Sequence, residues 1–134
     1  MIEDDAGLRS LLENTRTIAV VGLSANPERP SNEVAQYLRR AGYTIIPVNP
    51  ACTEILGEKC YPSLREVPVQ IDMVDVFRKP EEVMPIVDDA IAVGARSLWL
   101  QLGVIAPEAV KRAETAGLAV VMDRCTKIEH RRLV

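Results

Sequence analysis

The stretch TIAVVGLSANPERPSNEVAQYLRRAGYTIIPV, residues 17–48, decides the fold. It opens with an apolar, β-type run that ends at Gly22. It continues through a segment whose apolar residues have helical spacing and passes Gly42 into a second apolar run, Thr44–Val48. A glycine just after a helical segment is typical of a helix C-terminus, where the backbone needs positive φ. The stretch therefore predicts a strand, a helix and a second strand.

The rest of the chain repeats this pattern. Three further apolar runs follow: IDMVDVF at 71–77, Ser97–Leu100 and Leu118–Met122. The last two again come after a helical segment that ends in glycine, at Gly94 and Gly117. Near-continuous apolar runs are typical of parallel strands that are buried on both faces. We predict an α/β fold, a Rossmann-like, doubly wound, three-layer sandwich with a five-stranded parallel sheet in the order 3-2-1-4-5.

That strand order predicts where a ligand binds. Ligands of doubly wound sheets lie outside the carboxyl ends of the strands, at the point where the strand order reverses. In the order 3-2-1-4-5 this point lies between strands 1 and 4. The segments that follow the strands, among them residues 22–31, 77–79 and 101–103, are therefore the candidates for a binding site.

Length and composition predict one domain over residues 1–134, with an N-terminal helix at about residues 4–14. Residues 50–68 lack a clear helix, although Ser63–Val67 could form one turn. The 48% of hydrophobic and 26% of charged residues are typical of a soluble globular protein. No apolar run reaches the roughly 18 residues that cross a bilayer, and the N-terminus is acidic, so we expect a cytoplasmic location.

Charge and cysteine usage argue against other classes of protein. The net charge of -3 disfavours general nucleic-acid binding, which depends on a basic face. The three cysteines are odd in number and none of them stands in a CxxC pair, so we expect free thiols. Because His130 is the one histidine, a zinc site would need ligands scattered over the chain, and we expect no metal.

The segment after Gly22 does not match the common nucleotide-binding motifs. A GxGxxG fingerprint would need glycines where Ser24 and Pro27 stand. The GKS or GKT of a P-loop is also missing. An NAD or ATP site of the standard kind is therefore disfavoured.

The same segment still suits an anion. A helix that begins near Ser31 or Asn32 offers free N–H groups, and Arg29 adds a guanidinium. Arg78 and Lys79, at the end of the third strand, would join them at the same edge of the sheet. In the alternative interpretation, Ser31 only caps the helix and Arg29 is a solvated loop residue.

Several stretches, taken in order, carry a resemblance to a known family: TIAVVGLSANPERPSNEVAQYLRRAGYTIIPVNP, ILGEKCYPSLREVP, DMVDVFRKP, LWLQLGV and VVMDRCTKIEH. Together they resemble the small single-domain CoA-binding proteins, relatives of the N-terminal CoA-binding domain of succinyl-CoA synthetase α-subunits. The resemblance covers residues 15–133. It implies a Rossmann-like fold with coenzyme A lying across the carboxyl ends of the strands.

The resemblance also implies a set of ligand-binding residues, assigned by position. They are Gly22, Leu23, Ser24, Asn26 and Arg29 for the pyrophosphate or 3′-phosphate, Ser31 and Asn32 for the helix N-terminus, Asn49, Pro50, Phe77, Arg78 and Lys79 beside the adenine and ribose, and Leu102 and Gly103 along the pantetheine arm. The synthetase has a second domain with a phosphorylated histidine, for which this chain has no room. The implied function is therefore binding of CoA or an acyl-CoA without a catalytic centre, as a carrier, a sensor or a partner of a CoA-dependent enzyme.

Two other classes of function stay open. An oxidoreductase or transferase that uses NAD(P) or another nucleotide would need the missing glycines and an acidic residue for the ribose, where only Asn49 stands. In a protein-interaction domain, Arg29, Arg78 and Lys79 would be ordinary surface charges. A protein partner or a homodimer is compatible with the sequence, whereas a membrane or nucleic-acid partner is not expected.

Single residues outside these motifs receive structural interpretations. Asp72 and Asp75 are three apart in a strand and face opposite sides, so we expect no acid–base pair. Asp123 is expected to cap a helix or pair with its neighbour Arg124, and His130 to lie partly exposed in a tail without a catalytic partner. Cys125 is expected to be buried and inert; a mixed disulfide with the CoA thiol is the alternative hypothesis.

Overall fold

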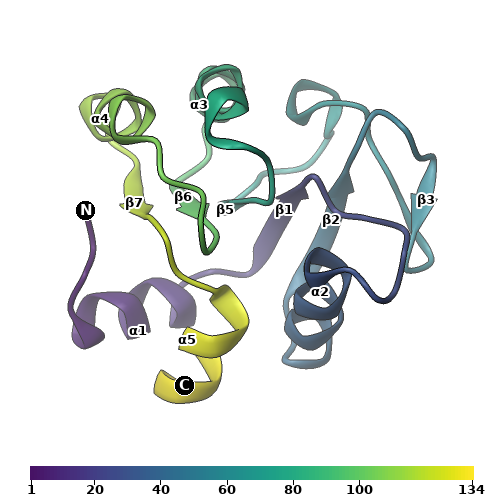
Figure 1. The fold of residues 1–134 in the computed structure, drawn as a ribbon, viewed down its shortest axis with the longest axis horizontal. Helices are drawn as coiled ribbons and strands as arrows, with labels where there is room; N and C mark the ends of the chain where they lie inside the picture. Colours follow the sequence, from purple (N-terminus) through teal and green to yellow (C-terminus); the bar gives the residue numbers. More distant parts are fainter.

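Five parallel strands form the central sheet of the computed structural model, which describes residues 1–134 (Figure 1). Apolar residues fill both of its faces, because alternate side chains of each strand point to opposite sides. The strands are β1 (Thr17–Val21), β2 (Thr44–Val48), β5 (Met73–Val76), β6 (Ser97–Leu100) and β7 (Ala119–Val121). The expected α/β class and the five parallel strands are confirmed, and β2 and β6 have the expected bounds.

The strand order differs from the predicted one in the place of a single strand. The sheet runs β2-β1-β5-β6-β7, which is 2-1-3-4-5 in chain order, because β5 pairs with β1 and not with β2. The connection from β2 to β5 contains no long helix, and its short turn packs on the α3 side of the sheet, opposite α2. It therefore crosses β1, and the order reverses between β1 and β5 instead of between strands 1 and 4.

Helices cover both faces of the sheet (Figure 1). One face carries α1 (Asp5–Glu13), α2 (Pro30–Arg40) and α5 (Thr126–Leu133), and the other carries α3 (Val83–Ala92) and α4 (Pro107–Thr115). The N-terminal helix lies where it was predicted, with Asp4 accepting a hydrogen bond from the backbone of Gly7 as its cap. None of these helices combines the length and the apolarity needed to cross a membrane.

The helix α5 is new with respect to the sequence prediction, which left its residues as a tail. Its buried positions are Thr126, Glu129 and Leu133, which have helical spacing, but two of them are polar. Glu129 is buried because Arg124 and Arg132 donate hydrogen bonds to its carboxylate at 2.7 and 2.9 Å. A pattern of apolar residues alone therefore could not reveal this helix.

The connection from β2 to β5 is built of short elements. A hairpin of β3 (Glu54–Ile55) and β4 (Glu58–Lys59) is followed by one 3-10 turn, η1 (Leu64–Glu66), inside the predicted range. A second short turn, η2 (Pro80–Glu82), leads from β5 into α3. Both η1 and η2 stand at the carboxyl edge of the sheet, where they become walls of the candidate site.

Candidate functional site

The carboxyl ends of β1, β2, β5 and β6 border one continuous cleft. Three hollows make up this cleft, and each shares a residue with the others: Gly22, Phe77 or Arg78. The cleft straddles the gap between β1 and β5, where the strand order reverses. The fold therefore places the candidate site at the edge of the sheet that ligands of doubly wound proteins use.

Gly22 ends β1 at a point where no side chain fits. Its φ is +87°, and a Cβ atom there would lie 2.6 Å from the carbonyl oxygen of Phe77 and 2.8 Å from Cδ of Arg78. Its N–H donates to the Val48 carbonyl at 2.9 Å. The glycine thus lets the chain pass close to the end of β5 and turn towards α2, as the phosphate-binding turn of such folds requires.

The first turn, residues 22–31, is held together by its own polar groups. The Ser31 hydroxyl accepts from the N–H of Ser24 at 3.0 Å, and the buried Asn32 amide donates to the Ser24 carbonyl at 2.8 Å. Asn26 accepts from the N–H of Glu28 at 3.0 Å. These predicted site residues are brought together, and they build the shape of the turn.

The beginning of α2 contradicts the alternative interpretation, in which Ser31 only caps the helix. The helix starts at Pro30, one residue earlier than expected, and Arg29 holds the cap position without a capping hydrogen bond from its side chain. Ser31 therefore lies inside the helix and does not cap it. Its N–H has no acceptor in the protein, and Ser31 lines the same hollow as Gly22 and Arg29.

Leu23 and Asn49 were predicted to contact the ligand, but their side chains make other contacts in the structure. The Leu23 side chain is fully buried in the core, so it cannot contact a ligand. The Asn49 amide donates to the Leu23 carbonyl at 3.0 Å, which ties the end of β2 to the first turn. Pro50, next to Asn49, lines the cleft.

Three residues, Arg29, Arg78 and Lys79, give the cleft its positive charge, and only Arg78 is paired with a carboxylate. Arg78 donates to both carboxylate oxygens of Glu82, at 3.0 and 2.9 Å, and this hydrogen bonding holds the pKa of Glu82 below its ordinary value. Arg29 and Lys79 are exposed and have no ion-pair partner. An anion would thus find two unpaired cations and one that a carboxylate already neutralises.

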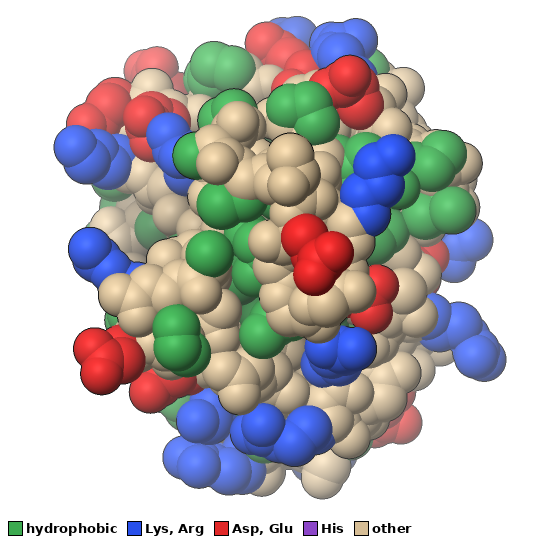
Figure 2. Space-filling model, turned by 90° about the vertical axis from the view of Figure 1, so that its right-hand side faces the viewer, with side chains coloured by type: hydrophobic (Ala, Val, Ile, Leu, Met, Phe, Trp, Pro, Cys, Tyr) green, Lys and Arg blue, Asp and Glu red, His purple; other side chains and the backbone are tan.

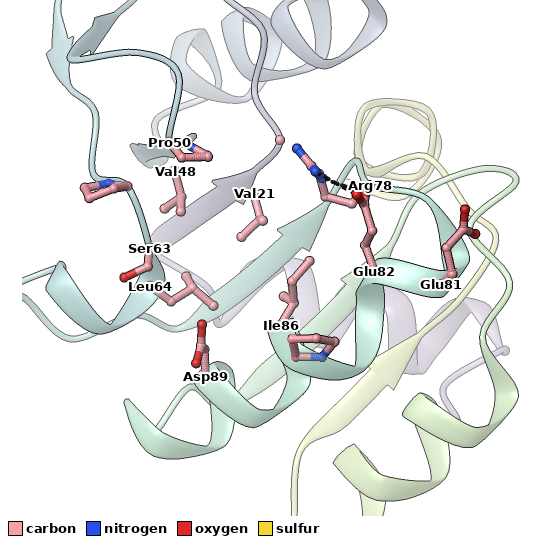
Figure 3. A pocket seen from close by; sticks show the side chains of 13 residues that line it. Val21, Val48, Pro50, Ser63, Leu64, Arg78, Glu81, Glu82, Ile86 and Asp89 are labelled. Carbon is pink, nitrogen blue, oxygen red and sulfur yellow. Dashed lines mark hydrogen bonds and ion pairs between the residues drawn. The ribbon is translucent and has the colours of Figure 1, made fainter.

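One part of the cleft is a cavity of about 330 Å³ between η1 and α3 (Figure 3). Val21, Val48, Leu64 and Ile86 give it an apolar side, while the paired Arg78 stands at its mouth. The acidic residues Glu81, Glu82 and Asp89 also line it. It can hold a flat, mainly apolar group whose polar edge meets these charges.

Much of this cavity was missed by the sequence prediction. Ser63, Leu64, Ile86 and Asp89 line it, although only their secondary structure had been considered. The missing information was the strand order, because η1 and α3 become neighbours only when β5 lies beside β1. The apolar spacing in α3 predicted its core face but not the residues at its open edge.

The far end of the cleft is a turn after β6. The Gln101 carbonyl accepts from the N–H of Val104 at 2.9 Å, and Leu102 at its tip is 60% exposed. Asp123 accepts from the N–H of Gly103 at 2.8 Å. Asp123 therefore ties two loops together, which replaces the expected helix cap or pair with Arg124.

A buried polar network lies directly behind this turn. Asp75 is fully buried, and its oxygens accept from Gln101 at 2.7 Å and from Thr126 at 3.1 Å. Burial raises the pKa of Asp75 to about 7, because these two neutral donors only partly offset the loss of water. Asp72, by contrast, accepts from the N–H groups of Arg16 and Thr17 at the amino edge, so the two carboxylates do not form a pair.

The remaining candidates for chemistry lie away from the cleft. His130 sits in α5 with its Nδ1 2.8 Å from the Tyr37 hydroxyl, and burial lowers its pKa. It is thus packed against the helix α2 and not part of a free tail. Cys125 is unpaired and half-buried, where full burial had been expected, and no group of three or more potential ligands is arranged to hold a metal ion.

The surface carries both signs of charge. On the face that Figure 2 shows, which is the right-hand side of Figure 1, acidic and basic side chains stand among exposed hydrophobic ones. No single-sign field covers this face. This face is therefore not a uniformly basic surface of the kind that binds nucleic acids.

Comparisons with known proteins agree on one family. The family model described as CoA binding domain matches residues 16–131. A protein of Bacillus subtilis, uncharacterized protein YneT, is 39% identical over 125 residues, which is 93% of each chain. A solved structure, a hypothetical protein from Pyrococcus horikoshii, is 44% identical with a TM-score of 0.95 over 98% of this chain and 92% of that one.

Larger proteins contain a similar segment. The acetate–CoA ligase (ADP-forming) I of Archaeoglobus fulgidus is 27% identical over 120 residues. This alignment covers 82% of the present chain but only 18% of the ligase. The chain is therefore similar to one part of such a ligase and lacks most of its length.

Proposed function

The chain belongs to the CoA-binding domain family, and from this premise we propose that it binds coenzyme A or an acyl-CoA in the cleft at the carboxyl ends of its strands. The observation that carries the proposal is the meeting of the first turn and the end of β5. There, Ser31, whose helix N–H is free, and the exposed Arg29 line a hollow together with Gly22, and the exposed Lys79 lines the adjoining hollow after β5. Coenzyme A has phosphates at two places and needs more positive charge than NAD does.

The parts of coenzyme A fit different parts of the cleft. The pyrophosphate or the 3′-phosphate would lie at the N-terminus of α2, where the N–H of Ser31 and the guanidinium of Arg29 face an anion. The adenine would enter the cavity between η1 and α3, whose apolar side suits a planar base. The pantetheine arm would leave along Phe77 and Leu102 towards the turn after β6.

We propose a binding role without a catalytic centre of its own. The titratable side chains that line the cleft are arginines, a lysine and carboxylates, which do not include a nucleophile with an adjacent base. The similarity to one part of a much longer acetate–CoA ligase supports a role beside a separate enzyme, as a carrier, a sensor or a partner. The cytoplasm remains the expected location.

Calorimetric titration with CoA, acetyl-CoA, NAD and ADP tests the proposal. We expect CoA to bind much more tightly than NAD. Arg29→Ala should weaken the binding of CoA about tenfold, which corresponds to around 1.4 kcal/mol. Arg96→Ala is the matched control, because Arg96 is exposed, has no ion-pair partner and precedes β6 at the opposite edge of the sheet. Absence of CoA binding, or an equal loss in both variants, would refute the proposed site.

The nucleotide-dependent alternative predicts a different result. An NAD(P)-dependent enzyme would bind NAD at least as tightly as CoA in the same titration. A protein-interaction domain would bind none of the four ligands, and Arg29→Ala would change nothing. The lengthened first turn without the dinucleotide glycines argues against the first of these two.

A further inference from the structure

Gln101 is the most buried residue with a polar side chain in the wall of the cleft beyond β6. Gln101 is only 4% exposed and lines the hollow that also contains Phe77 and Leu102. Its amide nitrogen donates to Asp75 Oδ1 at 2.7 Å and to Thr126 Oγ1 at 2.8 Å. Thr126 in turn donates to Asp75 Oδ2 at 3.1 Å, which closes a ring of three buried side chains.

This ring fixes which way the Gln101 amide points. Both N–H groups of the amide have acceptors behind them, and a reversed amide would set its oxygen against the Asp75 carboxyl. Asp75 Oδ1 accepts a hydrogen bond in the charged and in the neutral form, since a proton can sit on Oδ2 beside Thr126. The orientation of Gln101 is held most firmly when Asp75 is ionised, because an ionised carboxylate can only accept.

The amide oxygen of Gln101 is left without a partner in the protein. No hydrogen bond reaches Oε1, whereas every fully buried side-chain N or O atom has a partner. Oε1 must therefore be accessible, and the open space next to Gln101 is the cleft. A nearly buried side chain thus presents one unsatisfied hydrogen-bond acceptor to the site.

The hydrogen-bond acceptor Gln101 Oε1 favours some chemical groups of a ligand over others. Phosphate oxygens only accept hydrogen bonds, so they would be repelled by Oε1. A neutral group with an N–H would be held, because Leu102 and Phe77 provide apolar contacts on either side. The pantetheine arm of coenzyme A has this character, as it is uncharged and carries two amide N–H groups.

We propose that Gln101 Oε1 accepts a hydrogen bond from an amide N–H of the pantetheine arm, with Asp75 and Thr126 as positioning residues behind it. This inference rests on the proposed function, since it presupposes coenzyme A in the cleft. It adds to that function a residue that distinguishes the arm from the nucleotide. It also gives the buried Asp75 a role at the site, through the orientation of Gln101.

The experiment compares two ligands that differ only in the arm. Coenzyme A and adenosine 3′-phosphate 5′-diphosphate, the same nucleotide without the arm, are titrated into the wild type and into Gln101→Met, which keeps the length of the side chain and removes the acceptor. We expect CoA affinity to fall about three- to tenfold, the usual range for one hydrogen bond, with no change for the armless nucleotide. Gln70→Met makes the same exchange outside the cleft and should change neither affinity.

Each other outcome decides against the inference. Equal losses for both ligands would make Gln101 a structural residue, and no loss for either would leave it without a contact. If the wild type binds the armless nucleotide as tightly as CoA, the arm is not held and this inference fails while phosphate binding stands. If the wild type binds neither ligand, the proposed function itself fails and the inference with it.

A second variant covers the case that Gln101→Met does not fold, as judged by circular dichroism and thermal unfolding. Thr126→Val removes one acceptor behind the amide but leaves the Gln101 oxygen in place. We expect CoA affinity to fall about two- to threefold, because the amide can then rotate, with the armless nucleotide again unaffected. Unchanged CoA affinity in a folded Thr126→Val would overturn the positioning role.

Discussion

The two ends of the cleft are built in opposite ways. Within the first turn, the bonds that join Ser24 to Ser31 and to Asn32 span seven and eight positions, and residues 25–30 are all exposed. At the other end, the ring of Asp75, Gln101 and Thr126 joins residues 25 to 51 positions apart, and it is buried. The first turn can be exchanged locally, whereas the buried ring depends on the whole fold. The following predictions test this difference.

The largest effect is expected from the titration of the buried ring. Because burial raises the pKa of Asp75 to about 7, the folded protein binds a proton that the unfolded chain has lost above its ordinary pKa of 3.8. The free energy of unfolding should therefore fall as the pH rises from about 4 to about 7, by up to about 4 kcal/mol at 1.36 kcal/mol per pKa unit. Above pH 7 this contribution should be constant.

Chemical denaturation of the wild type and Asp75→Asn between pH 4 and pH 8 measures this contribution. The substitution replaces the carboxyl group by an amide that does not titrate, so the difference between the two curves isolates the carboxyl group. Carboxylates with lowered pKa values, such as Glu82 and Glu129, act in the opposite direction but occur in both proteins. Parallel curves would show that Asp75 does not titrate in this range.

A smaller effect is expected at Gly22, where the first turn packs against the end of β5. Gly22→Ala should lower the free energy of unfolding by about 3 kcal/mol, because it adds a clash with the Phe77 carbonyl to the cost of positive φ. Gly57→Ala is the matched control, with φ of +74° and open space around it, and should cost about 1 kcal/mol. Urea unfolding measures both variants. Equal losses of unfolding free energy would contradict the close approach of Gly22 to the Phe77 carbonyl.

The smallest effect is expected at Arg78, which lines both the cavity beside η1 and the hollow after β6. Glu82→Gln removes the carboxylate that occupies this guanidinium, so CoA affinity should rise about two- to threefold, as for an exposed ion pair. Raising the salt concentration should reduce the gain, because exposed charges are screened. Calorimetric titration at two salt concentrations checks both statements, and a loss of affinity would mean that Glu82 itself positions Arg78 for the ligand.

The difference between local and long-range contacts also explains which parts of the fold could be predicted from the sequence. Thr44–Val48 and Ser97–Leu100 were located correctly because each apolar run follows a glycine that ends a helix, a signal contained in a few neighbouring residues. The place of β5 in the sheet could not be predicted in this way, because it is set by the connection from β2 to β5, which has no periodic helix to read. Local patterns thus predicted the elements, and their pairing needed the fold.

The candidate site follows the same rule. The first turn and the cations Arg29, Arg78 and Lys79 could be placed at one sheet edge, since all follow the ends of parallel strands. Whether these residues bind a ligand stays a prediction. The cavity beside η1 and the ring behind Gln101 combine segments far apart in the chain, and a buried carboxylate such as Asp75 resembles an ordinary strand residue until its neighbours are known.

The exposed part of the first turn has a consequence for protein engineering. Residues 25–30 contribute nothing to the hydrophobic core, and the bends on either side of them are held by Gly22 and the buried Asn32. A library that varies Ala25, Pro27 and Glu28 would sample new ligand preferences at little risk to folding, because it keeps Asn26, which shapes the turn, and the start of α2 at Pro30. The fold therefore offers a replaceable recognition loop on a fixed scaffold, in the way that antibody domains carry their variable loops.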